Sequence, residues 1–114
     1  MEAPQVSKNE HITYNELPDD LKRIRWCESY DRHFLPDGSV IKGIQNPLDI
    51  GRYMINLHYH KARADALGID LFNESGNEAY ARILYNEQGS KPWYWSYDPI
   101  TKKCINGVVI PEKY

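Results

Sequence analysis

The sequence predicts an α+β fold in which a small antiparallel sheet has two or three helices packed on one face. Three features indicate this. Several segments combine helix-capping residues with apolar residues at helical spacing, a Pro-Asp-Gly turn signal lies between apolar residues, and the C-terminal quarter is rich in aromatic and β-branched residues. Helices and strands are therefore expected within one layered domain.

The composition is that of one ordinary globular domain. The chain has 114 residues, of which 41% are hydrophobic and 26% charged, and no apolar run approaches the length of a membrane span. Residues 1–10 are polar and show no apolar period, so we expect a disordered arm there and a single α+β domain over residues 11–114. No membrane partner is expected.

A first helix is expected over residues 15–25. Asn15 can cap its start, Pro18 suits its first turn, and nearby acidic residues favour the positive end of the helix dipole. Beyond Arg25 a strand is favoured, because large side chains fall on alternate positions (Ile24, Trp26, Tyr30 and Phe34). The helix is thus expected to give way to a strand near residue 26.

The middle of the chain carries the clearest turn signal. Residues 36–38, Pro-Asp-Gly, are expected to form the turn of a β-hairpin, because glycine supplies a positive φ. Asn46 and Pro47 are typical of a helix cap followed by proline at the first helical position. The sequence predicts that this second helix runs to Leu67 and stops at Gly68.

A third helix is expected over residues 77–88, with Gly89 closing it. Its inward side chains would be Tyr80, Ile83 and Leu84. A strand over residues 79–85 is the alternative, and the choice between the two sets the size of the sheet.

The C-terminal quarter is expected to be a β-meander. Residues 93–97 are aromatic and strand-like, residues 98–99 (Asp-Pro) signal a turn, and residues 104–110 contain β-branched side chains. Pairing of these strands with the hairpin at residues 36–38 would complete one antiparallel sheet.

The cysteines, Cys27 and Cys104, are far apart in the sequence, and the start of the chain lacks the apolar core of a secretion signal. A cytoplasmic location is therefore expected, because a reducing compartment keeps such thiols free. Both thiols are expected to be buried. A long-range disulfide is the alternative.

Familiar catalytic and cofactor motifs are absent from the sequence, so no catalytic residue, cofactor or metal is assigned. His58 and His60 would share a metal ion on a strand but point apart on a helix, and the expected helix favours the second arrangement. His33 lies near Asp31 and Glu28, which suits a general base and the solvated face of a strand equally.

Residues 93–97 are the segment most suggestive of binding. On a strand, Trp93, Trp95 and Tyr97 share one face, and Tyr94 lies on the other. Packing of the first row in the core is favoured, since the chain has few leucines to fill its interior. An exposed row would instead indicate a binding surface.

The function that these observations favour is that of a protein-binding module, which acts by occupying the surface of a partner protein. Small inhibitors and accessory proteins of phages and mobile elements share its short length, acidic balance and lack of a catalytic set. The expected contacts are aromatic residues and nearby lysines: Trp93, Tyr94, Trp95, Tyr97, Lys91, Lys102, Lys103, Trp26, Tyr30 and Tyr53.

Two other functions remain open. A nucleic-acid-binding module would use the aromatic strand with the three lysines, although a net charge of −2 opposes this. A metal- or His-dependent hydrolase would use His33, His58 and His60. The partner is thus expected to be another protein, with nucleic acid as the second choice.

Overall fold

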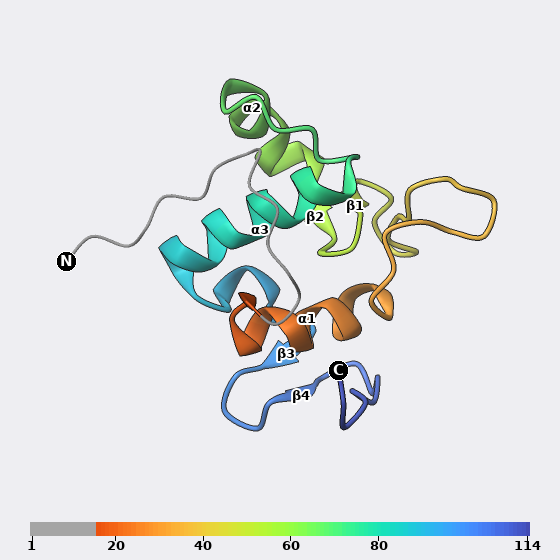
Figure 1. Cartoon of the computed structure of the whole chain (residues 1–114), viewed down its shortest axis with the longest axis vertical. Coiled ribbons are helices and arrows are strands. Elements are labelled where there is room, and N and C mark those ends of the chain that lie inside the picture. The colour runs from red at the N-terminus through yellow and green to blue at the C-terminus, as the bar shows by residue number, and fades with distance from the viewer. Residues whose placement is uncertain (1–15) are drawn as a thin grey trace.

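The computed structural model describes residues 16–114 (Figure 1), so the expected arm over residues 1–10 and the cap at Asn15 lie outside the described residues. The helices are α1 (Asp19–Ser29), α2 (Leu57–Ala66) and α3 (Glu74–Gln88), with a short 3-10 helix, η2 (Lys91–Trp93). Strands β1 (Asp49–Ile50) and β2 (Ile55–Asn56) pair antiparallel, as do β3 (Tyr97–Asp98) and β4 (Lys103–Cys104). Within residues 16–114 no helix is both long and apolar enough to cross a membrane. The expected α+β class is confirmed.

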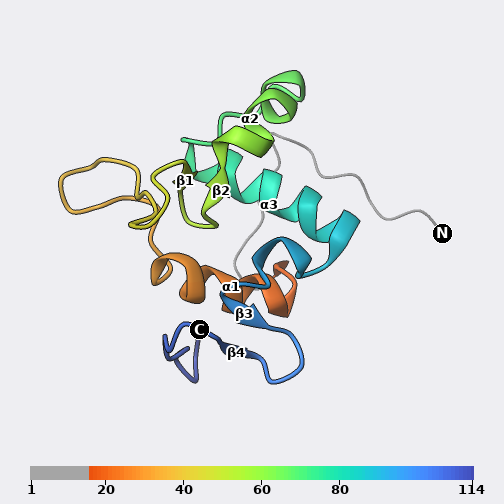
Figure 2. The same cartoon turned by 180° about the vertical axis from the view of Figure 1, so that it is seen from behind.

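Helix α3 lies between α2 and α1, while β1 and β2 lie near α2 and the C-terminal hairpin lies against α1 (Figures 1 and 2). Asn73 caps α3 by accepting a hydrogen bond from the Gly76 N–H at 3.1 Å. A side chain at Gly76 would place its Cβ 2.2 Å from the Asp70 carbonyl oxygen, so only glycine permits this close approach. The expected helix is confirmed and the strand over residues 79–85 is wrong. The buried side chains of α3 include Ala79, Tyr80, Ala81 and Leu84.

Asn77 joins α3 to the segment around β1. Its side chain is fully buried, and its Oδ1 accepts the Tyr53 N–H at 3.0 Å. Its Nδ2 donates to the carbonyls of Ile50 and Leu71, each at 3.0 Å. Gly51, with a φ of +77°, makes room for this amide, because a Cβ there would lie 2.3 Å from Asn77 Nδ2. A buried amide whose hydrogen bonds are satisfied fixes one packing arrangement.

Helix α1 runs further than expected. It begins after Pro18 and continues to Ser29, so the strand expected beyond Arg25 is wrong. Its buried face continues because Cys27 and Ser29 pack inward, and the Ser29 hydroxyl donates to the Arg25 carbonyl at 3.0 Å. The helix ends at Tyr30, whose φ of 54° is left-handed.

The second helix begins at Leu57, so the start expected at Asn46 is wrong. The Asn46 side chain instead accepts the N–H two residues ahead of it in a turn, and β1 follows. The cap is Asn56, which accepts the Tyr59 N–H at 3.2 Å. The expected end is confirmed, with Gly68 at a φ of +71°.

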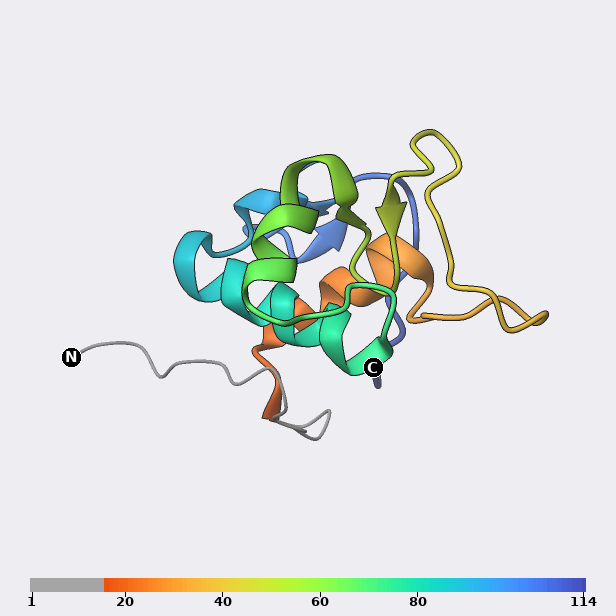
Figure 3. The same cartoon turned by 90° about the horizontal axis from the view of Figure 1, so that it is seen from above.

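The hairpin turn expected at residues 36–38 is confirmed. Phe34 pairs with Val40, and the Leu35 N–H donates to the Ser39 carbonyl at 2.8 Å. The turn stands away from the helices (Figure 3).

The aromatic segment is not the strand that its alternation predicts. Lys91–Trp93 forms η2, residues 94–96 form a turn, and only β3 pairs with β4. Pro92 fixes a φ that suits the first turn of a helix. The turn after Asp98 is confirmed by the Lys102 N–H, which donates to the Asp98 carbonyl at 2.8 Å. The described strands form two separate sheets in place of one.

Cys27 and Cys104 form a disulfide, so the expectation of free thiols is wrong. Their Cα atoms lie 5.3 Å apart, although 77 positions separate them in the sequence. The two cysteines meet because the C-terminal hairpin packs against α1. The bond therefore ties the end of α1 to β4.

Candidate active site

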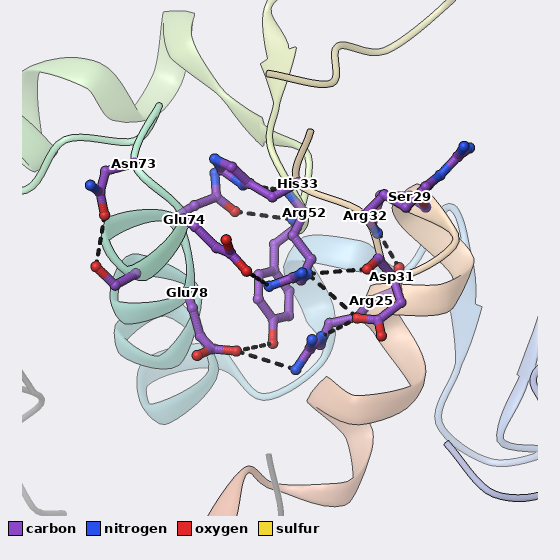
Figure 4. A network of polar contacts seen from close by, with 12 residues as sticks. Arg25, Ser29, Asp31, Arg32, His33, Arg52, Asn73, Glu74 and Glu78 are labelled. Atoms are coloured by element: carbon purple, nitrogen blue, oxygen red, sulfur yellow. Dashed lines mark hydrogen bonds and ion pairs between the residues drawn. The ribbon is translucent and has the colours of Figure 1, made fainter. Parts of the chain in front are cut away.

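Two groups of polar side chains lie near the C-terminal half of α1. The first is the arginine network, which consists of Arg25, Asp31, Arg52, Glu74 and Glu78 (Figure 4). Arg25 Nε lies 2.6 Å from Asp31 Oδ1, and Arg25 Nη1 lies 3.4 Å from Glu78 Oε1. Arg52 Nη1 lies 2.7 Å from Glu74 Oε1, and Arg52 Nε lies 3.4 Å from Asp31 Oδ1. Each carboxylate of the network is paired with an arginine.

His33 lies beside this network and is 1% exposed, so it is not on the solvated face of a strand. Its Nδ1 accepts the Arg52 backbone N–H at 3.1 Å, and its Nε2 donates to the Phe72 carbonyl at 2.8 Å. These partners require the neutral ring with a hydrogen on Nε2. Burial lowers the His33 pKa, which also favours this neutral form. His33 therefore links the backbone at Arg52 to the backbone at Phe72, and both of its ring nitrogens have hydrogen-bond partners.

His58 and His60 lie on α2, and side chains two positions apart on a helix point in different directions. His58 is exposed, and His60 Nδ1 lies 2.9 Å from the Tyr80 hydroxyl. Among residues 16–114, no group of three or more His, Cys, Asp or Glu side chains is arranged to hold a metal ion.

The second polar group lies in a groove of about 1000 Å³. The groove is bounded by the end of α1, the strands β1 and β2, the start of α2 and the turn after η2. We call it the Glu28 groove, and its polar side chains include Glu28, Asp49 and Ser96. A smaller cavity of about 720 Å³ beside the arginine network is lined in part by network members that already pair with one another.

Glu28 is the titratable group with the most unusual surroundings in the groove. Burial, and to a smaller extent the negative charge of Asp49, raise its pKa to about 7, and a hydrogen bond from the Ser96 hydroxyl partly offsets this. No described residue forms an ion pair with it. Glu28 is partly exposed to the groove. A carboxyl group in such a place keeps a proton near neutral pH and can donate it to a bound molecule.

Asp49 supplies a second carboxylate in the same groove. It lies on β1 opposite Asn56 of β2, whose Nδ2 donates to Asp49 Oδ1 at 2.8 Å. The strand pairing and this hydrogen bond together fix the position of the Asp49 side chain. The groove thus contains two carboxyl groups in different surroundings.

Exposed aromatic rings line the same groove. Trp95, Tyr59 and Tyr30 line the groove and are 80%, 76% and 56% exposed. Trp95 stacks on Tyr94, with ring centroids 4.8 Å apart. Large aromatic side chains left uncovered beside a groove are typical of a ligand-binding surface.

The structure divides the predicted contact residues between core and surface. Trp93, Tyr97 and Tyr53 lie in the core. Trp93 Nε1 donates to the Tyr53 carbonyl at 2.9 Å, and the Tyr97 hydroxyl donates to Asp20 Oδ1 at 2.7 Å. Trp26 is partly buried on α1. The exposed members are Tyr30, Tyr94, Trp95, Lys91, Lys102 and Lys103.

Sequence reasoning missed Glu28, Asp49 and Ser96 as a group. Ser96 is 68 positions from Glu28 along the chain, and its contact depends on the packing of the C-terminal segment. A continuous helix through Glu28 would have been one signal, because it places this acid at the end of an inward-facing stripe.

Comparison of the chain with protein-family models, with curated proteins and with solved structures finds no match.

Proposed function

We propose that this protein cleaves glycosidic bonds, with Glu28 as the general acid. The observation that carries the proposal is a carboxyl group that lines a large groove and forms no ion pair with a described residue, and whose burial raises its pKa to about 7. Glycosidase chemistry needs such a carboxyl group, which is protonated at neutral pH and gives its proton to the departing sugar oxygen.

The proposed reaction divides the work between two carboxyl groups. The Glu28 proton goes to the glycosidic oxygen as the bond between this oxygen and the anomeric carbon breaks. The Asp49 carboxylate provides negative charge near the positively charged sugar that develops. Water adds to the anomeric carbon, and a proton returns to Glu28, so the cycle is one of hydrolysis.

The side chains around the groove favour a carbohydrate over a peptide or an ester. Acyl transfer requires an activated nucleophile, but both cysteines are joined in the disulfide, and the Ser96 hydroxyl hydrogen-bonds to the Glu28 carboxyl group, which keeps a proton near neutral pH. Aromatic rings suit the apolar faces of sugars. Amide groups that can bind sugar hydroxyls also line the groove, namely the side chains of Gln45 and Gln88 and the Nδ2 group of Asn46.

The disulfide favours an oxidising compartment, in contrast to the cytoplasmic location expected from the sequence. We therefore propose that the protein acts on a polysaccharide outside the cytoplasm.

The test is incubation of the protein with a panel of neutral, amino-sugar and uronic-acid polysaccharides. New reducing ends and released fragments are measured by colorimetry and mass spectrometry. We expect cleavage of at least one polymer and a loss of at least about a hundredfold in Glu28→Gln. The matched control is Glu112→Gln, which makes the same change at an exposed position outside the groove. Equal activity in Glu28→Gln and wild type would contradict the proposal.

A second candidate function is the protein-binding module predicted from the sequence. The exposed Tyr94 and Trp95 rings support it, since such a pair also suits the centre of a protein interface. A pull-down with wild type and Trp95→Ala, with and without nuclease, separates the possibilities. A partner that survives nuclease and is lost with Trp95→Ala would support protein binding. Loss on nuclease treatment would favour nucleic acid, with the exposed Lys102 and Lys103 as contacts.

A further inference from the structure

We propose that Ser96 is the positioning residue of Glu28: its hydroxyl holds the Oε1 atom, so that the acidic proton lies on Oε2, which faces the groove. This inference rests on the proposed role of Glu28 as a general acid. It assigns the orientation of the carboxyl group to one side chain.

The two oxygens of Glu28 have different surroundings. Oε1 receives the hydrogen bond from the Ser96 hydroxyl. Oε2 has no hydrogen-bond partner among residues 16–114, where the only fully buried side-chain polar atom without a partner is Trp26 Nε1. Oε2 must therefore reach solvent-accessible space, and the groove is the space that Glu28 lines. An oxygen that already accepts a hydrogen bond is the poorer site for a proton, so the proton belongs on Oε2.

The backbone holds Ser96 in place from two sides. Its N–H donates to the Trp93 carbonyl at 3.0 Å, and its carbonyl accepts the Ile105 N–H at 2.8 Å. Ser96 is 9% exposed, so its side chain has little room to turn away. The Cys27–Cys104 disulfide joins the residue before Glu28 to the residue before Ile105. The disulfide thus joins the helix that carries Glu28 to the segment that hydrogen-bonds to Ser96.

The Ser96 hydroxyl can serve Glu28 in both protonation states. With the neutral carboxyl group its one hydrogen is shared between Oε1 and the Trp93 carbonyl, and after the proton leaves from Oε2 it donates to a carboxylate, which makes the bond charge-assisted and stronger. The Trp93 carbonyl, 3.1 Å from Ser96 Oγ, is the competing acceptor. Because a hydroxyl carries one hydrogen, the charged carboxylate takes it in preference to the carbonyl. No heavy atom has to move between the two states.

The first test is a direct titration of the Glu28 carboxyl group by carbon NMR, with Glu28→Gln used to assign its signal. Removal of a donor to the carboxylate in Ser96→Ala should raise the Glu28 pKa by about one pH unit. Ser96→Thr, which retains the hydroxyl, should restore the wild-type value. Ser96→Gly provides a second hydroxyl deletion if the alanine variant does not fold. An unchanged or lower pKa in the hydroxyl-deletion variant would overturn the proposal.

The second test is the pH profile of kcat/KM on the polysaccharide that the wild type cleaves. In Ser96→Ala the alkaline limb should move upward with the Glu28 pKa, and kcat should fall about tenfold because the proton is no longer directed to the groove. Ser96→Thr should recover both. A wild type that cleaves no polysaccharide would defeat the proposed function, while the NMR titration would still decide whether Ser96 positions Glu28. A wild-type kcat and profile in Ser96→Ala would defeat the positioning role alone.

Discussion

The arginine network and the Glu28 groove start from the same helix, yet their carboxyl groups are in opposite situations. Asp31 and Glu78 both contact Arg25, one helical turn before Glu28. Glu28 itself has a serine and a second carboxylate, Asp49, as its neighbours. Burial is common to both regions. The difference lies in the pairing: each carboxylate of the network contacts an arginine, whereas no described residue forms an ion pair with Glu28, although Arg32 and Lys42 also line the groove.

This difference separates a structural role from a chemical one. A carboxylate beside an arginine remains charged and holds two segments together. A carboxyl group that is buried without a cation retains its proton to near neutral pH and becomes an acid. The largest expected effects on stability should therefore come from the network, and the largest effects on pH dependence from Glu28.

Removal of an arginine from the arginine network should have the largest effect on stability. Arg25→Met leaves Glu78 without a cation and Asp31 with only its 3.4 Å contact to Arg52, and we expect a loss of about 3 kcal/mol in the free energy of unfolding at pH 7. Chemical denaturation measures this loss. The control is Arg63→Met, which removes an exposed pair with Glu87 and should cost less than about 1 kcal/mol. Equal losses in the two variants would remove the distinction.

Replacement of Glu28 by the neutral glutamine should change the free energy of unfolding by an amount that depends on pH. The Glu28 pKa of about 7 in the folded protein lies above its ordinary value of 4.5, so the folded state binds the proton more tightly. The stability that this proton contributes is complete below pH 4.5 and is lost as the pH rises through 7. Relative to Glu28→Gln, the wild type should lose no more than about 3 kcal/mol over this range.

Denaturation of wild type and Glu28→Gln at matched pH values measures this difference. A constant difference from pH 4 to pH 8 would show that Glu28 has an ordinary pKa. Because the test does not depend on activity, it examines the raised pKa of Glu28 separately from the proposed reaction.

His33 should make the free energy of unfolding depend on pH in the opposite direction. Its pKa in the folded protein is lowered from 6.5, so its contribution to stability is present above pH 6.5 and is lost as the pH falls through the folded value. Glu28→Gln exposes this slope by removing the competing group. Denaturation of that variant should show falling stability below about pH 6.5. Burial also lowers the His60 pKa, so the added change His60→Gln should reduce this slope without abolishing the part that His33 contributes. A flat acid profile would contradict the buried neutral ring.

Trp95 should have the smallest effect on stability. Because the side chain is 80% exposed, Trp95→Ala should change the free energy of unfolding by less than about 0.5 kcal/mol. If the ring binds sugars, the same change should raise KM for the cleaved polysaccharide about tenfold. Ile100→Ala, at a residue 89% exposed and outside the groove, is the control for both measurements.

Local chemistry explains which parts of the fold could be predicted. The turn at residues 36–38 and the end of the second helix at Gly68 depend on glycines that adopt a positive φ, and the sequence shows these directly. The prediction of a helix start at Asn46 was wrong because asparagine caps turns as well as helices. The strand at residues 93–97 failed because Pro92 starts a helical turn, which places Trp93 in the core and Trp95 outside.

The candidate site depends on contacts between distant segments. The raised pKa of Glu28 and its hydrogen bond depend on burial and on Asp49 and Ser96, and neither of these residues is near it in the sequence. The strand wrongly expected after Arg25 also placed Glu28 on an open surface. Its helical position and its burial follow from the packing of the C-terminal hairpin against α1, which no local pattern encodes.

The disulfide also determines how the chain would respond to a protease. Residues 99–102, in the turn between β3 and β4, are exposed and present a site for a single cut. A cut there leaves the two fragments attached through Cys27 and Cys104. The nicked protein should keep its intact mass plus one water, and its C-terminal fragment should separate only after a reductant is added.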